Sequence, residues 1–145
     1  MTVTDRQVAT LRAQLAGDFE EHKRLLAQFD EASDARPYVT LTNAAFFEAA
    51  DRRFGGTAPA DGITGFVAGV RSRSEKVRAA LDPRVAERVL LAVVADADIS
   101  DLDPREVRSS QTILLNALIA DEGLDGAGLD GFMAAARQSA DRLLN

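Results

Sequence analysis

The stretch that decides the fold class is residues 82–95, DPRVAERVLLAVVA. Asp82 is a residue type that caps helices, and Pro83 would take the first helical position, where its missing N–H costs nothing. The apolar residues that follow point in nearly every direction around a helix, which predicts an element buried on several sides. A buried strand over 89–95 is the alternative. We favour the helix, because the apolar run continues from a capped start and no other segment offers a partner strand of comparable strength.

Apolar residues at three- and four-residue spacings extend this pattern along the chain. Together with 83–96, these spacings predict helices over 5–29, 42–54, 62–80, 104–122 and 129–144. Two of the helices have an internal weak point, because Gly17 allows a bend in the first and a break near 72–74 would divide the third. No segment alternates apolar and polar residues convincingly. We therefore expect an all-α, bundle-like domain of about six helices.

Short polar motifs mark the expected helix ends. The run Thr4-Asp5-Arg6-Gln7 is a capping box, in which a hydroxyl and an amide satisfy the first backbone N–H groups. Later caps of the same chemistry are Thr42, Asp61 and Asp103. Gly55-Gly56 and Gly123-Leu124 are typical of left-handed helix ends. The segment 30–37 contains acidic residues and a proline, which predicts a loop.

The composition bounds the class of protein. The chain has 145 residues, of which 46% are apolar, and this size predicts a single domain over 1–145. The absence of cysteine excludes disulfides and thiolate chemistry and is typical of a reducing compartment. Residues 1–10 lack the basic and apolar runs of an export signal, and no apolar run is long enough to span a bilayer. We therefore expect a cytoplasmic protein.

The net charge of −6 conceals a segregation of charge along the chain. Residues 71–88 carry six basic and three acidic side chains, whereas 96–131 carry two and nine. The acidic total disfavours binding to nucleic acid and to anionic membranes. A DNA-binding regulator that uses Arg71, Arg73 and Arg78 is kept as an alternative. No aromatic residues are interleaved for base stacking, and the loop between the second and third helices is longer than a helix-turn-helix turn.

The segment 96–106 alternates oxygen-bearing side chains between two predicted helices. Hard cations prefer oxygen ligands. The first, third and fifth positions of a calcium loop would be Asp96, Asp98 and Ser100. The pattern then departs from that loop, because Asp101 stands where glycine is needed and Val107 where glutamate is needed. Asp101 and Asp103 also have a structural interpretation, as caps whose charge complements the helix dipole.

This junction resembles a known family over a short run. Ala95-Asp96-Ala97-Asp98-Ile99-Ser100-Asp101 is similar to the acidic helix junction of tellurite-resistance B (TerB-like) helical domains, although the usual glycine after the first aspartate is missing. We assign the chain to no family on this run. A helical domain that responds to divalent cations is the alternative function. Its candidate ligands are Asp96, Asp98, Asp101 and Glu106, and we commit to no metal.

The sequence lacks the common catalytic constellations. His22 is the only histidine, and it falls on the apolar stripe of 5–29 with Asp18 four residues before it. A general base or a pH sensor is the functional interpretation of His22, and a partly buried histidine at the edge of the core is the structural one. No serine lies in a glycine-flanked elbow, and the glycines of 123–131 lack the strand and the lysine of a phosphate loop. We expect a non-enzymatic protein without a cofactor.

Aromatic residues on 42–54 suggest an interface. Phe46 and Phe47 are adjacent and diverge by about 100° on a helix, so a single core does not readily absorb both. Phe54 and Tyr38 lie near them in sequence, and aromatic residues are enriched at interface cores. The leading expectation is therefore a protein that acts through protein–protein contacts, as an accessory or regulatory subunit or as a homodimer. The interface candidates are Phe46, Phe47, Phe54, Arg71, Arg73 and Arg78.

Overall fold

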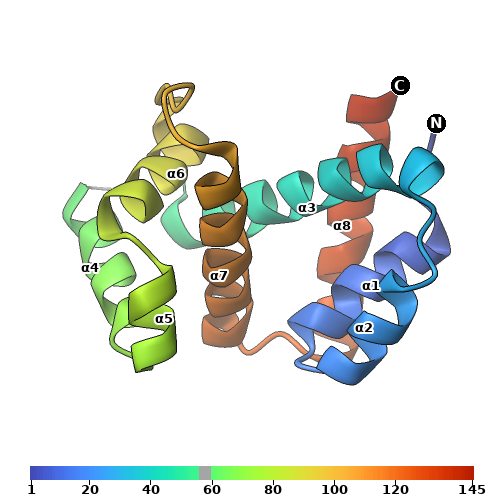
Figure 1. Ribbon diagram of the computed structural model, residues 1–145, viewed down its shortest axis with the longest axis horizontal. Helices are drawn as coiled ribbons and strands as arrows, with labels where there is room; N and C mark the ends of the chain where they lie inside the picture. The colour runs from blue at the N-terminus through green and yellow to red at the C-terminus, as the bar shows by residue number, and fades with distance from the viewer. Residues whose placement is uncertain (56–59) are drawn as a thin grey trace. The chain divides into compact units, whose positions relative to one another are not determined.

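The computed structural model describes residues 1–55 and 60–145, of which 79% are helical and none lies in a strand (Figure 1). The predicted all-α class is therefore confirmed. These residues form eight helices instead of about six: α1 Asp5–Leu15, α2 Phe19–Leu26, α3 Glu31–Phe54, α4 Ala60–Arg71, α5 Glu75–Ala80, α6 Pro83–Ala95, α7 Pro104–Glu122 and α8 Gly126–Leu144. Within the described part of the chain, no helix combines the length and the apolar character needed to cross a bilayer.

The decisive stretch 82–95 is helical, and the strand alternative over 89–95 is wrong. The Asp82 carboxylate accepts hydrogen bonds from the backbone N–H groups of Arg84 (2.9 Å) and Val85 (3.1 Å). Val89 and Leu90 are buried, whereas the last turn is only half-buried. The helix is thus enclosed most fully in its middle turns, and less evenly than its composition predicts.

The predicted helix over 5–29 is divided at Gly17. The N–H of Gly17 donates to the carbonyl of Gln14 (3.1 Å) and that of Asp18 to the carbonyl of Ala13 (2.9 Å), which is the Schellman pattern that ends α1. Gly17 has φ +79°, a left-handed conformation that favours glycine. The Asp18 carboxylate then caps α2 by accepting the N–H of Glu21 (3.2 Å).

The predicted helix over 62–80 is also divided, at the alternative break near 72–74. Ser72 donates its hydroxyl hydrogen to the carbonyl of Gly69 (2.7 Å), and α4 ends at Arg71. Ser74 has an extended backbone and accepts the N–H of Val77 (3.1 Å), which starts α5. The predicted cap at Asp61 is wrong, because α4 already includes that residue.

Helix α3 begins earlier than predicted. The loop expected over 30–37 is wrong, because α3 runs from Glu31 through Pro37. The backbone N–H of Asp30 donates to the Asp34 carboxylate (2.8 Å), which stabilises the start of the helix. Thr42 is therefore not a cap but an internal residue whose hydroxyl donates to the carbonyl of Val39 (2.8 Å).

The helix ends predicted from glycine are confirmed where the structure describes them. Gly55 has φ +57° and follows α3, while Gly56 lies outside the described residues. Gly123 has φ +67°, and its N–H donates to the carbonyl of Ala120 (3.1 Å). The N–H of Leu124 donates to the carbonyl of Ile119 (3.3 Å), which completes the Schellman end of α7.

The chain divides into two compact units, and each buries apolar side chains of its own. Unit 1 comprises Met1–Glu48 and Ile119–Asn145, and unit 2 comprises Ala49–Leu118. Large buried side chains of unit 1 are Leu11, Leu41, Phe46, Leu129 and Phe132. Those of unit 2 include Ile63, Val67, Leu81, Leu90 and Leu114. The single domain expected over 1–145 stays a prediction.

Polar contacts in unit 1 join the N-terminal segment and α1 to α8. The N–H of Val3 donates to the Asp141 carboxylate (2.7 Å), and Arg137 donates both to the Val3 carbonyl and to the Asp5 carboxylate (2.7 Å each). Farther along α1, Arg12 pairs with Asp130 at 2.6 Å. Val3 is buried, so these contacts hold an apolar anchor in place.

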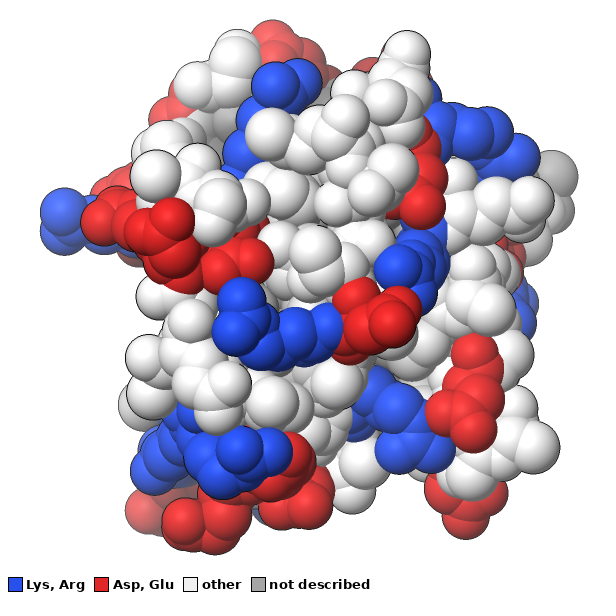
Figure 2. Space-filling model, turned by 90° about the vertical axis from the view of Figure 1, so that its right-hand side faces the viewer, with Lys and Arg blue, Asp and Glu red and all other residues white. Residues whose placement is uncertain are grey.

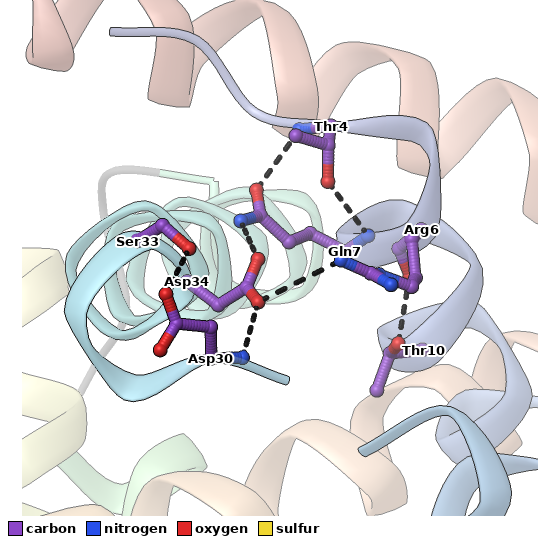
Figure 3. A network of polar contacts seen from close by, with 7 residues as sticks. All are labelled: Thr4, Arg6, Gln7, Thr10, Asp30, Ser33 and Asp34. Carbon is purple, nitrogen blue, oxygen red and sulfur yellow. Dashed lines mark hydrogen bonds and ion pairs between the residues drawn. The ribbon is translucent and has the colours of Figure 1, made fainter. Parts of the chain in front are cut away.

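A buried polar network joins α1 to the start of α3 (Figure 3). Gln7 and Asp34 are only 1% and 4% exposed. Gln7 completes the predicted capping box with Thr4, and its side-chain amide donates to the Asp34 carboxylate (2.7 Å). Arg6 lies 3.9 Å from the same carboxylate. The hydrogen bonds from the Asp30 backbone and from Gln7 lower the pKa of Asp34.

Replacing Gln7 with leucine is expected to destabilise the protein by about 1–3 kcal/mol, because a buried carboxylate loses a donor and the α1 cap loses its amide. The free energy of unfolding, measured by urea denaturation, tests this. Gln138→Leu makes the same change on the exposed face of α8 and is expected to alter stability by less than about 0.5 kcal/mol. Equal effects of the two substitutions would contradict the network's role.

Asp34 is expected to make stability fall at acidic pH. Its folded-state pKa lies below the ordinary value of an aspartate, so its ionised form stabilises the fold above that value, and this contribution is lost as the pH falls through the folded-state pKa. Asp34→Asn should lower the melting temperature at pH 7, and its difference from the native protein should shrink below about pH 4. A difference that is constant from pH 7 to pH 2 would exclude this account.

Candidate functional site

The aromatic interface candidates occupy three different environments. Phe46 is 1% exposed and belongs to the core of unit 1. Phe54 is half-buried and packs edge-to-face on Phe66, with ring centroids 5.7 Å apart. Phe47 is 54% exposed. Phe47 is therefore the one of the three whose ring is largely available to a partner.

Phe47 lines a groove of about 500 Å³ between α3 and α8, entirely within unit 1. We name it the Phe47 groove, and its lining residues are Asn43, Ala44, Phe47, Glu48, Ser139, Arg142 and Leu143. Leu143 is 70% exposed and, with Phe47, makes the groove mainly apolar. Leu143 was not among the interface candidates of the sequence analysis. It lies in the final turn of α8, beyond the buried residues of that helix.

Tyr38 does not line the Phe47 groove. Its ring packs edge-to-face on Phe29, with centroids 5.0 Å apart. Its hydroxyl is buried, has no hydrogen-bond partner among the described residues, and has a pKa raised by burial to about 12. Tyr38 therefore contributes to packing in unit 1 and not to the exposed aromatic surface.

The basic segment 71–88 does not form one uniform surface. Arg71 and Arg78 line a cavity of about 450 Å³, whereas Arg73 lines a different one of about 220 Å³. Figure 2 shows a different surface, on the side of α1, α2 and α8, where basic and acidic side chains lie next to one another with uncharged residues between them. A DNA-binding role for Arg71, Arg73 and Arg78 stays a prediction.

Arg88 pairs with the acidic junction that follows α6. Its guanidinium donates to both carboxylate oxygens of Asp101 (2.8 and 2.6 Å) and to the backbone carbonyl of Asp98 (2.9 Å). The hydrogen bonds from Arg88 lower the pKa of Asp101 and, reciprocally, Asp101 raises that of Arg88. The carboxylate of Asp101 is thus held by an ion pair, whereas the predicted cap at Asp103 is confirmed by a 2.8 Å bond from the N–H of Arg105.

The candidate cation ligands are spread along this junction. Asp96 ends α6 in a left-handed conformation (φ 55°), and the Asp98 carboxylate accepts the N–H of Ser100 (2.9 Å), which lowers the pKa of Asp98. Glu106 lies on α7 and lines the cavity that contains Arg71. Over residues 1–55 and 60–145, no three acidic or histidine side chains are grouped so that they could hold a metal ion. A response to cations stays a prediction.

His22 is half-buried on α2. Its Nδ1 lies 2.8 Å from the backbone carbonyl of Thr10, so the ring joins α2 to α1 if Nδ1 carries the hydrogen. The Asp18 carboxylate accepts the N–H of Glu21 as the cap of α2 and makes no hydrogen bond to the ring among the described residues. These contacts fit the structural interpretation of His22.

No family model, no curated protein and no solved structure matches this chain. The features that indicate a function are therefore the Phe47 groove and the cavity beside Arg71.

Proposed function

We propose that this chain is a non-catalytic, cytoplasmic interaction protein that forms a homodimer through the Phe47 groove. The observation that supports it is the exposure of two large apolar side chains, Phe47 and Leu143, on the two sides of one groove. Full burial of such a side chain from full exposure is worth about 1.5–3 kcal/mol, and since Phe47 and Leu143 are 54% and 70% exposed, covering each supplies roughly half of that or more.

The position of Phe47 follows from its neighbour. Phe46 is fully inside unit 1, and consecutive side chains on a helix diverge by about 100°. Phe46 faces the core, and Phe47, about 100° farther around the helix, turns toward the surface. An aromatic residue on a regular helix is a rigid contact surface that loses little conformational entropy when it is covered.

The chemistry of the groove suits a second copy of the same chain. A two-fold dimer places the same patch of each copy against the other, so the patch must be complementary to itself. Asn43 and Ser139 can each donate and accept hydrogen bonds. Glu48 and Arg142 bring one negative and one positive charge, so the groove is neutral although the whole chain carries −6. Two copies therefore meet here without the repulsion that their net charges would otherwise cause.

The homodimer predicts that Phe47→Asp and Leu143→Asp shift the protein toward monomer. Losing a central aromatic or aliphatic contact costs about 2 kcal/mol or more, equivalent to about a 30-fold rise in the dimer dissociation constant. Sedimentation velocity across a concentration series measures this constant. Melting temperatures of the variants near that of the native protein, measured at a concentration at which the native protein is monomeric, would establish that the variants are folded.

Phe19→Asp is the matched control, because Phe19 is 56% exposed on α2 and lies outside the groove. It makes the same chemical change and adds the same charge, and it should leave the dissociation constant unchanged. A native protein that is monomeric up to about 1 mM would reject self-association and leave the groove to a different partner. Equal weakening by Phe19→Asp and Phe47→Asp would reject the groove as the interface.

A further inference from the structure

Unit 2 contains a cavity of about 450 Å³ with a different chemistry from the Phe47 groove. Three arginines line it, Arg71, Arg78 and Arg105, and we name it the arginine cavity. Ser109 and Ser110 of α7 supply hydroxyl groups. Other lining residues are apolar, among them Ala79, Ala80, Leu81, Pro83 and Val85. The cavity therefore combines positive charge, hydroxyl groups and apolar surface.

Arg71 is fixed in the wall of this cavity by neutral partners. Its Nε donates to the carbonyl of Leu81 (2.9 Å) and its Nη2 to the carbonyl of Arg78 (3.5 Å). Both carbonyls belong to lining residues, so the half-buried guanidinium is held at the cavity. No carboxylate in the described part of the chain forms an ion pair with Arg71. The guanidinium is thus held in place while its positive charge is not neutralised, and it keeps further N–H donors for a ligand.

The acidic residues of the cavity compensate its charge incompletely. Asp82 and Glu106 also line it, against three arginines. The Asp82 carboxylate is already the cap of α6, since it accepts the N–H groups of Arg84 and Val85. Asp82 keeps its charge in that role, so three arginines against two carboxylates leave one net positive charge in the lining, and removing the charge of Glu106 should strengthen the attraction for an anion.

We propose that the arginine cavity binds a small organic phosphate monoester. Guanidinium groups match phosphate oxygens in geometry and in charge, and a monoester carries about −1.5 to −2 at neutral pH. The volume is in the range of small-molecule sites. Leu81 and Val85 offer apolar surface to the organic part of the ligand. This site belongs to unit 2 and does not depend on the Phe47 groove of unit 1.

Calorimetric titration with phenyl phosphate at about 0.01 M salt, where charge interactions are screened least, tests the proposal. We expect binding of one molecule per chain, and affinity reduced about tenfold or more by Arg78→Gln or Arg105→Gln. Glu106→Gln should increase the affinity. These substitutions leave the backbone carbonyls that hold Arg71 in place, and melting temperatures would establish that the variants are folded.

Arg108→Gln is the matched control, because Arg108 is exposed on α7 and does not line the cavity. It removes the same charge and should change the affinity less than about twofold. Phenol should not bind, and inorganic phosphate should bind several-fold more weakly than phenyl phosphate. No heat and no melting shift with phenyl phosphate, or equal weakening by Arg105→Gln and Arg108→Gln, would overturn the site. Equal affinity for the two phosphates would overturn the organic ligand.

Discussion

The carboxylate of Asp34 is the constraint on which unit 1 depends. It is almost inaccessible to water, and it is stable there because the side-chain amide of Gln7 and the backbone N–H of Asp30 both donate to it. The same contacts set the start of α3 and join it to the cap of α1. Helix α3 continues without interruption from Glu31 to Phe54, so the contacts of Asp34 lie at the start of the same helix that carries the two phenylalanines. Its later turns place Phe46 in the core and Phe47 at the surface.

The ends of helices could be predicted from the sequence wherever a short motif supplies the hydrogen-bond partners of the neighbouring backbone groups. The Thr4 capping box, the Asp82 cap with Pro83 and the left-handed end at Gly123 were all correctly located. Each involves donors and acceptors only a few residues apart, so the pattern contains the whole interaction. The number of helices was harder to predict, because Gly17 was expected to bend a helix, whereas a Schellman end followed by the Asp18 cap divides it.

Contacts between distant residues could not be predicted in this way. Gln7 and Asp34 are 27 positions apart in the sequence. The acidic segment 30–37 was therefore predicted as a loop, because the residue that satisfies the Asp34 carboxylate lies on another helix. Arg88 and Asp101 are 13 positions apart, so the sequence pattern predicted Asp101 as a helix cap, whereas its carboxylate pairs with the Arg88 guanidinium. For the candidate sites, the sequence identified Phe47, Arg71 and Arg78 but missed Leu143 and Arg105, whose significance comes only from the cavities that they line.

The ion pair between Arg88 and Asp101 also affects the susceptibility of the connection between α6 and α7 to proteolysis. A protease must draw several extended residues into its cleft before it can cut, and the guanidinium holds a side chain and a backbone carbonyl of this connection at once. The ion pair is exposed to solvent, so salt weakens it. The ion pair therefore helps to hold this acidic connection in place, and its contribution falls as the ionic strength of the solution rises.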